Sequence, residues 1–349
     1  MSVDSTVMPP SDPQTIPAEF INHGGQVSAA RARYPQAPSP WLDLSTGISP
    51  WAYPIPELPV ECWSRLPDPA DLARLIAAAR RRYSAPDGAA VAPVAGTDLA
   101  IAILPLLFSA ARDIAIVAPT YGAHEAAWTA GGHRVRMVDD LNDLIGDGIG
   151  VVVNPNNPDG QIWPRDQIAG AAVRLRKSGG LLIIDEAFAD VAPGSSFLSP
   201  DADLSNVIVL RSFGKFYGLA GVRLGFVITS HSVGATLADT LSAWPVSGPA
   251  IEIGCAALSD EDWADENVHR LEAAASRLDD ILQAAGFTVI GGTALFRLAS
   301  QASGWRVFHQ LAQQGILTRP IRSNGDAIRF GVPGRDEDFE RLRSALATL

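Results

Sequence analysis

Short apolar runs alternate with stretches of helical periodicity through the middle of the chain. The apolar runs predict buried strands at 114–118, 133–138, 149–154, 181–185, 206–210 and 223–229. The stretches between them predict helices near 97–110, 121–131, 165–178 and 232–242. Buried strands that alternate with helices are typical of a mostly parallel sheet covered on both faces. The pattern therefore predicts an α/β fold.

The pattern differs on both sides of this region. A loop-rich stretch leads to DPADLARLIAAARRRY, where a helix is predicted with Asp68 or Asp71 as its cap and Pro69 in its first turn. After Trp244, a long helix at about 261–285, four short strands and a last helix at 335–348 predict a smaller α+β domain. We expect a mobile tail at 1–20, an N-terminal segment at 21–49 that packs with the small domain, a large domain at 50–245 and a small domain at 246–349.

Composition narrows the class of protein. The 349 residues are 47% apolar, which suffices for two structural units. A net charge of −11 argues against a nucleic-acid partner, because such binding needs a basic face. The two cysteines, Cys62 and Cys255, form no CxxC motif and predict free thiols in a reducing compartment. We see no secretory signal, and the longest apolar run is too short to span a bilayer, so we expect a cytoplasmic protein without a membrane partner.

One lysine follows a predicted buried strand, in RSFGKFYGLAGVRLGF. Lys215 is either an ordinary loop lysine or an amine that forms a Schiff base, with its pKa lowered by partial burial and a neighbouring cation. Arg223 is a candidate for that cation, or else a surface residue at the start of a strand.

Other polar residues lie at strand ends of the same predicted sheet, where ligands bind in open parallel sheets. Asp185 is either a turn aspartate or a buried carboxylate that keeps a proton on a heterocyclic nitrogen, as pyridoxal phosphate requires. Glu186 and Asp190 are expected to be solvated or structural. Asn157, in NPNNPDG, is either a turn residue or a donor to the phenolate oxygen of that cofactor.

A phosphate group also has candidate ligands. Gly96, Thr97 and Asp98 open a predicted helix, whose first backbone N–H groups suit an anion, although glycine before a helix is common. Ser212 is a candidate to add a hydroxyl. Tyr121, in APTYG, is either a core aromatic residue or a ring that stacks on the cofactor.

Together these motifs resemble the fold-type I pyridoxal-phosphate enzymes. SFGKFYGLAGVRLGF is similar to their lysine motif, and APTYG, NPNNPDG and DEAF precede it in the order of that family. The resemblance runs from about residue 22 to the C-terminus. It implies a seven-stranded, mostly parallel sheet between helices, a smaller C-terminal domain, pyridoxal 5′-phosphate as cofactor and a homodimer.

The resemblance also implies roles for individual residues. Lys215 would bind the cofactor aldehyde, Asp185 the pyridine nitrogen and Asn157 the ring O3′, while Tyr121 would stack on the ring. The phosphate would be held by Gly96, Thr97, Asp98, Ser212 and Arg223.

The family branch follows from other motifs. The chain is most similar to the branch of histidinol-phosphate aminotransferases. Its NHGGQVSAARARY, LSTGI, RLPDP and GILTRP resemble the threonine-phosphate decarboxylases of cobalamin biosynthesis within that branch. The substrate would then be L-threonine O-3-phosphate, a small phosphorylated amino acid. The residues expected to bind it are His23, Gly47, Asn157, Arg319 and Arg329.

Three positions depart from the common aminotransferase pattern. Phe188 and Leu66 stand where many relatives have a tyrosine, and Gly214 stands where a hydroxyl residue is usual. An aminotransferase and a non-catalytic binding protein therefore remain as alternatives to a decarboxylase.

Overall fold

The computed structural model describes residues 18–108, 110–241, 243–321 and 324–349. The chain divides into two compact units, which we describe separately. The large unit comprises Ile48–Ala275 and Gly292–Leu295. The small unit comprises the described residues up to Gly47, together with Ser276–Gly291 and Phe296–Leu349. The tail expected at 1–20 lies outside the described residues up to residue 17, and helix α1 begins at Ala18.

The large unit is built on a seven-stranded sheet with the strand order β2-β8-β7-β6-β5-β3-β4. Strands β4, β3, β5, β6 and β7 are parallel, and β8 is antiparallel to both of its neighbours. This confirms the predicted mostly parallel α/β sheet. The strands are β2 Ala90–Val94, β3 Asp113–Val117, β4 Arg134–Val138, β5 Ile149–Val153, β6 Leu181–Asp185, β7 Val207–Ser212 and β8 Gly225–Thr229.

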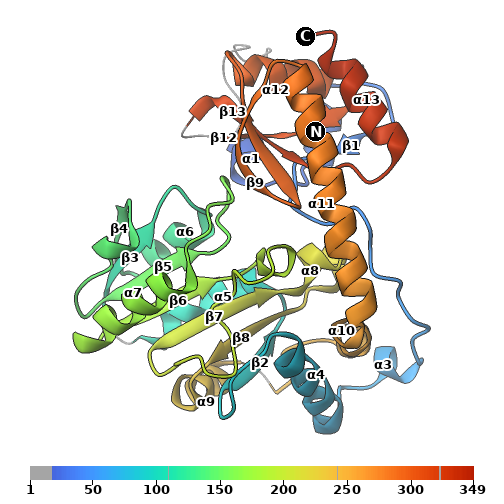
Figure 1. Cartoon of the computed structure of the whole chain (residues 1–349). Helices are drawn as coiled ribbons and strands as arrows, with labels where there is room; N and C mark the ends of the chain where they lie inside the picture. The colour runs from blue at the N-terminus through green and yellow to red at the C-terminus, as the bar shows by residue number, and fades with distance from the viewer. Residues whose placement is uncertain (1–17, 109, 242, 322–323) are drawn as a thin grey trace, which may run out of the picture. The chain divides into compact units, whose positions relative to one another are not determined.

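Helices cover both faces of this sheet (Figure 1). Ile101 of α5, Trp128 of α6 and Leu237 of α9 share one buried core with strand residues such as Ile116 and Val151. Figure 1 shows α5 behind the sheet and α7 in front of it. The helices of this unit are α3 Glu61–Ser64, α4 Pro69–Arg82, α5 Thr97–Ile103, α6 Ala123–Ala130, α7 Arg165–Lys177, α8 Phe213–Phe216, α9 His231–Thr240, α10 Gly248–Ser259 and the first part of α11 Glu261–Ala284.

Local chemistry explains several helix ends. The Asp68 carboxylate accepts a hydrogen bond of 2.8 Å from the backbone N of Ala70, which confirms Asp68 as the cap of α4. The helix predicted at 97–110 ends as an α-helix at Ile103 and continues as a 3₁₀ turn over Leu104–Leu107. Pro105, in that turn, lacks the N–H that an α-helix would need there.

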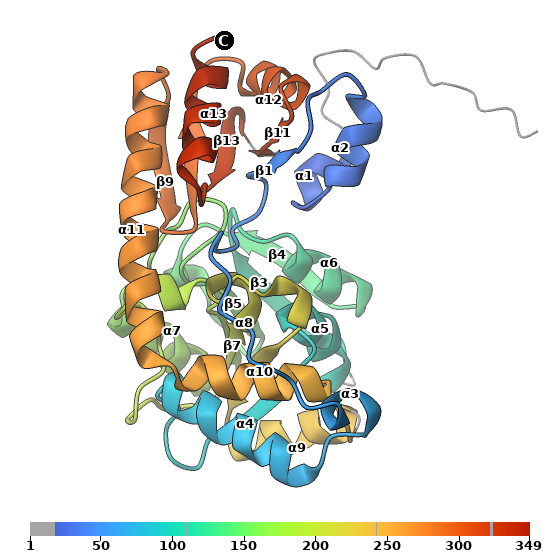
Figure 2. The ribbon, with the colours of Figure 1, turned by 90° about the vertical axis from the view of Figure 1, so that its right-hand side faces the viewer.

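Helix α10 was not predicted, and it lies beside α4 (Figure 2). The helices approach closely because Gly254 has no side chain; a Cβ there would lie 2.7 Å from the Leu75 side chain. Helix α10 and the first part of α11 fall in the large unit, whereas the sequence analysis placed them in a small domain from residue 246. Compact units and domains need not coincide, so the predicted domain boundaries stay a prediction.

The small unit contains a four-stranded sheet with the order β12-β13-β10-β9, in which β13 is antiparallel to β10 and β12. A two-stranded parallel pair, β1 with β11, joins its N-terminal and C-terminal segments. The strands are β1 Leu42–Asp43, β9 Thr288–Thr293, β10 Phe296–Ser300, β11 Ile316–Leu317, β12 Arg319–Ile321 and β13 Asn324–Gly331. The helices are α1 Ala18–Asn22, α2 Val27–Arg33, the end of α11, α12 Gly304–Gln313 and α13 Asp336–Leu346.

The described residues show neither a membrane-spanning helix nor a cluster of metal ligands. None of the helices described is long and apolar enough to cross a membrane. Among the same residues, no group of three or more His, Cys, Asp or Glu side chains is placed to hold a metal ion.

Candidate functional site

The predicted cofactor residues of the large unit lie after the carboxyl ends of neighbouring strands. Asp185 ends β6, Ser212 ends β7, and Lys215 lies in the short helix α8 that follows β7. Asn157 follows β5 and is buried. Because β5, β6 and β7 are adjacent and parallel, their ends lie along one edge of the sheet.

The Asp185 carboxylate is buried, with 3% of the residue exposed. Its Oδ1 accepts a hydrogen bond of 3.1 Å from the backbone N of Ala187. Its Oδ2 lies 3.0 Å from Nε2 of His124, which donates because a carboxylate only accepts. His124 lies on α6 and is fully buried, and its Nδ1 has no hydrogen-bond partner among the described residues. The sequence analysis did not identify His124.

Two glycines near the predicted phosphate ligands have no space for a side chain. Gly96 has φ +91°, and a Cβ at this position would lie 2.6 Å from Nη2 of Arg223. A Cβ on Gly225 would lie 2.9 Å from the backbone N of Thr97, and Gly225 pairs with Ser212 across β7 and β8. Arg223 itself has a left-handed backbone, with φ 54°. The structure thus brings together Gly96, Thr97, Ser212 and Arg223.

A line of contacts connects these residues with Asp185. The Tyr121 hydroxyl donates a hydrogen bond of 3.0 Å to Oδ1 of Asp98, and Oδ2 of Asp98 lies 3.8 Å from Nη2 of Arg223. The rings of Tyr121 and His124 meet edge to face with centroids 6.5 Å apart. Arg223, Asp98, Tyr121, His124 and Asp185 therefore lie in one continuous line of contacts.

Lys215 is half-buried, and its Nζ lies 5.4 Å from the centroid of the Phe188 ring. Gly214 immediately precedes it and has no room for a side chain, because a Cβ there would lie 2.7 Å from Cα of Ala220. The missing hydroxyl at position 214 thus follows from packing. The sequence holds one other lysine, Lys177, which is exposed at the end of α7.

The small unit carries two arginines side by side. Arg319 of β12 pairs directly with Arg329 of β13, so their side chains leave the same face of the sheet. Arg329 is 2% exposed, donates a hydrogen bond of 2.8 Å to the Ser45 carbonyl and lies 4.9 Å from the Phe296 ring centroid. Like charges placed directly opposite each other are unfavourable in a sheet. Two guanidinium groups on one face of a sheet are suited to bind an anion.

The other predicted substrate residues of the small unit lie on either side of Ser45. Gly47 is buried and His23 is exposed. The backbone N of Gly25 donates a hydrogen bond of 2.7 Å to the Ser45 hydroxyl. A Cβ on Gly24 would lie 2.3 Å from the Ser45 carbonyl oxygen, which accounts for the glycine after His23. Ser45 therefore links the His23 segment with Arg329.

Comparison with known proteins identifies the family of this chain. The family model for aminotransferase class I and II matches residues 68–346. The chain is 41% identical to a threonine-phosphate decarboxylase from a Sinorhizobium species, over 94% of this chain and 98% of that one. It is 38% identical to the threonine-phosphate decarboxylase of Pseudomonas aeruginosa, over 94% and 97% of the two chains.

A solved structure shares the fold. The histidinol-phosphate aminotransferase of Sinorhizobium meliloti, solved in complex with pyridoxal-5′-phosphate, superposes with a TM-score of 0.78 at 22% identity, over 92% of this chain and 93% of that one. On the sequence match and the shared fold, the chain belongs to the class I and II aminotransferase family.

Proposed function

We propose that this protein decarboxylates L-threonine O-3-phosphate with pyridoxal 5′-phosphate as cofactor, and so makes 1-aminopropan-2-yl phosphate for cobalamin biosynthesis. The observation that carries the proposal is the 41% identity to a threonine-phosphate decarboxylase over 94% of this chain. The match extends over 98% of that relative, so it is not confined to one part of either chain.

The residues of the large unit suit this cofactor. The buried Asp185 carboxylate is the group that a pyridinium N–H requires, and His124 holds it on one side. The phosphate has three kinds of candidate ligand: backbone N–H groups at Gly96 and Thr97, the Ser212 hydroxyl and the Arg223 guanidinium. The backbone comes close to these groups, because a Cβ at Gly96 or Gly225 would have no space. When bound, the pyridine ring supplies an electron sink for the electron pair released at Cα of the substrate.

Three side chains of the large unit would have separate roles in the reaction. Lys215 would hold the cofactor through its aldehyde group and, as a free amine, would be the group that delivers a proton to Cα of the substrate. Asp185 keeps the ring nitrogen protonated, and His124 orients Asp185 through its Nε2 hydrogen bond. In the net reaction, a proton on Cα would replace the carboxylate, which would leave as CO₂.

The paired arginines of the small unit suit the two anionic groups of the substrate. A guanidinium matches phosphate through two parallel N–H bonds, and Arg319 and Arg329 lie side by side in adjacent strands. We propose that they bind the phosphate and the carboxylate, with help from His23, Gly47 and Asn157. Holding both anions selects which bond at Cα breaks, and a displacement of about 1 Å can change a rate about 100-fold.

A homodimer is part of the proposal. On the large unit, Trp63 and Leu66 are 69% and 66% exposed, and with Ile55 and Trp244 they line one hollow of about 730 Å³. Exposed apolar surface of this kind marks interaction sites. We propose that a second copy of this chain covers it. A cytoplasmic location is also proposed, and the two free cysteines support it.

The test is release of CO₂ from threonine phosphate in the absence of any keto acid. We expect turnover under these conditions, with one 1-aminopropan-2-yl phosphate formed for each CO₂. Turnover only with histidinol phosphate and 2-oxoglutarate would show that the protein is an aminotransferase instead. No turnover with any phosphorylated amino acid, despite bound cofactor, would favour a binding protein.

The attachment of the cofactor has a separate test. Because the sequence has two lysines, borohydride reduction followed by peptide mapping has few outcomes. We expect the label on Lys215, and loss of the visible absorbance and of CO₂ release in Lys215→Ala. Lys177→Ala is the matched control and should retain both. A label on Lys177 in the wild type would contradict the assignment.

A further inference from the structure

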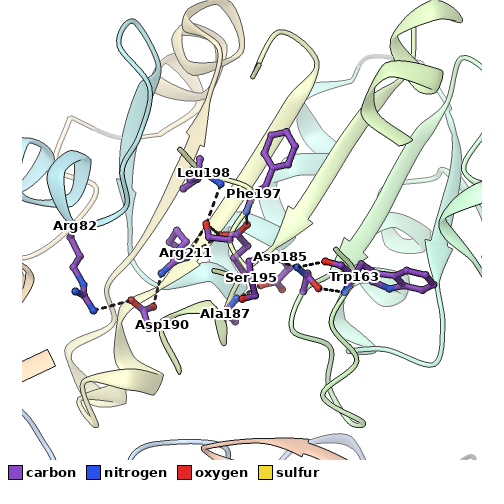
Figure 3. Close-up of polar contacts among 12 residues, drawn as sticks. Arg82, Trp163, Asp185, Ala187, Asp190, Ser195, Phe197, Leu198 and Arg211 are labelled. Atoms are coloured by element: carbon purple, nitrogen blue, oxygen red, sulfur yellow. Dashed lines mark hydrogen bonds and ion pairs between the residues drawn. The ribbon is translucent and has the colours of Figure 1, made fainter. Parts of the chain in front are cut away.

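Three buried charged side chains and the partly buried Arg82 form one network next to the cofactor residues of the large unit; Figure 3 shows Arg82, Asp190 and Arg211. We call Arg82, Glu186, Asp190 and Arg211 the charged quartet. Arg211 is 4% exposed and Glu186 is fully buried. Nη1 of Arg211 lies 2.9 Å from Oε2 of Glu186, and its Nη2 lies 2.8 Å from Oδ2 of Asp190. Nη2 of Arg82 lies 3.8 Å from the other oxygen of Asp190.

The charges of the quartet cancel, and further contacts hold it in place. Glu186 accepts hydrogen bonds of 2.6 Å from the Ser196 hydroxyl and from the backbone N of Phe197. The Arg211 guanidinium stacks 4.4 Å from the centroid of the buried Tyr83 ring. Burial alone would lower the pKa of Arg211, but the Asp190 and Glu186 carboxylates raise it, so Arg211 stays charged. Burial raises the pKa of the Glu186 carboxyl, while Arg211, the Ser196 hydroxyl and the Phe197 N–H act in the opposite direction.

Strand geometry places the quartet opposite the cofactor residues. Successive side chains of a strand leave opposite faces of a sheet. Asp185 and Glu186 are neighbours at the end of β6, and Arg211 and Ser212 are neighbours at the end of β7. Asp185 contacts His124, whereas Glu186 contacts Arg211. Each of the two strand ends therefore carries a cofactor residue on one face and a quartet residue on the other.

The Glu186–Arg211 pair thus connects the two strand ends across which the cofactor would lie. Backbone pairing adds to it, since Asp185 is registered with Leu210 and the N–H of Glu186 donates to the Leu210 carbonyl. A buried ion pair is not a good means of stabilisation, because apolar residues of similar volume often stabilise as well or better. The pair can still fix the distance between two backbones, because separating the two partners would leave buried charges unpaired.

We infer that Glu186 and Arg211 are positioning residues, which hold the carboxylate of Asp185 and the hydroxyl of Ser212 at the separation that a single cofactor molecule needs to reach both. The inference rests on the proposed cofactor. It predicts that weakening the pair lowers the affinity for a ligand that contacts both strand ends more than the affinity for a ligand that contacts only one.

The test variant is the double substitution Glu186→Met with Arg211→Met. It removes one charge of each sign and leaves Arg82 beside Asp190, so no net buried charge is created. Glu186→Gln is the second variant, because it keeps the size of the side chain: its carbonyl oxygen can still accept from the backbone N of Phe197, and its amide nitrogen can donate to the Ser196 hydroxyl. Arg176→Met, which breaks an exposed pair with Asp203 on the same unit, is the matched control.

The readout is the dissociation constant of three ligands: pyridoxal phosphate, pyridoxal without its phosphate, and inorganic phosphate. In the double variant we expect the affinity for pyridoxal phosphate to fall about tenfold or more, while the affinities for the two partial ligands change less than about threefold. In Glu186→Gln we expect a smaller loss with the same selectivity. Arg176→Met should match the wild type for all three.

Two results would overturn the inference. One is wild-type affinity for pyridoxal phosphate in the double variant or, if that variant does not fold, in Glu186→Gln. The other is an equal loss for all three ligands, which would show a general structural role. Both differ from failure of the proposed function, in which the wild-type protein itself would not bind pyridoxal phosphate or not release CO₂.

Discussion

The hydrogen bond between His124 and Asp185 provides a sharp test of the site. In His124→Phe, the ring remains but the Nε2 donor is lost, so Oδ2 of Asp185 is buried without its partner at 3.0 Å. Asp185 is 3% exposed and His124 is fully buried, so little water can replace the lost donor. We expect the carboxylate to be less well oriented and the bound pyridinium to be held less tightly.

The size of the effect follows from the charge of the acceptor. A hydrogen bond to a charged group contributes about 1.5–3 kcal/mol. Since about 1.4 kcal/mol corresponds to a factor of ten, the dissociation constant of pyridoxal phosphate should rise about 10- to 100-fold. The melting temperature of the cofactor-free protein should also fall, because the buried Asp185 carboxylate lacks its donor there too.

The assay is equilibrium titration of the cofactor-free protein with pyridoxal phosphate, followed by visible absorbance. His133→Phe is the matched control: His133 is also buried in the large unit, but it bonds to the Pro105 carbonyl and the Arg112 N–H. It should cost stability without changing cofactor affinity. If His124→Phe binds the cofactor as tightly as the wild type, the role given to His124 is wrong.

Three further predictions concern other parts of the molecule. Gly96→Ala should lower the free energy of unfolding by about 1–3 kcal/mol, because φ +91° with ψ 151° suits glycine alone, and it should weaken cofactor binding by displacing Arg223. The control Gly170→Ala, inside α7, should not destabilise the protein. Equal unfolding midpoints for the two variants would contradict this prediction. Burial and the nearby Arg33 lower the pKa of His309 below 6.5, so its stabilising contribution is present above pH 6.5 and is lost as the pH falls through the lowered value. Chemical unfolding at pH 7.5 and pH 5 should therefore show that acidification lowers the free energy of unfolding less in His309→Asn than in the wild type. The substitution His231→Asn, at an exposed position, should behave as the wild type. An equal decrease in the free energy of unfolding in all three proteins would disprove the claim. Trp63→Glu with Leu66→Glu should shift the protein toward monomer in analytical ultracentrifugation, because two charges enter the exposed apolar hollow, whereas an unchanged sedimentation coefficient would place the dimer contact elsewhere.

Strong local signals made most of the large unit predictable. The strand at 181–185 was predicted with its observed bounds, because an unbroken apolar run ends there in an acidic residue. Strand β2 was missed, since AVAPV is poor in strand-forming residues and contains Pro93. Proline is tolerated there because β2 is an edge strand, a fact of topology that the local sequence does not contain.

The sequence at the start of helix α10 contains the residues that typically begin a helix. Ser247 caps it through a bond to the N–H of Ala250, Pro249 lies in its first turn, and apolar residues follow. The predicted small domain begins at residue 246, immediately before this helix.

The site residues show the same division between local and tertiary information. Lys215, Asp185 and Asn157 were identified because each follows a buried strand or stands in a turn motif. His124 was not, since AHEAAWTA reads as an ordinary amphipathic helix and the partner of His124 is 61 residues away in sequence. A histidine on the apolar side of a helix was the one available signal. Glu186 was expected to be solvated or structural, and its complete burial favours the structural alternative.

The pairing of β1 with β11 has a consequence for synthesis of the chain in the cell. Leu42 and Asp43 find their strand partners only at Ile316 and Leu317, and the Ser45 carbonyl finds its donor only at Arg329. At about 5–20 residues per second, a ribosome needs about 15–55 s to make the intervening residues. During that time the N-terminal segment is a nascent chain without its native neighbours. Its native contacts can therefore form only when translation is almost complete.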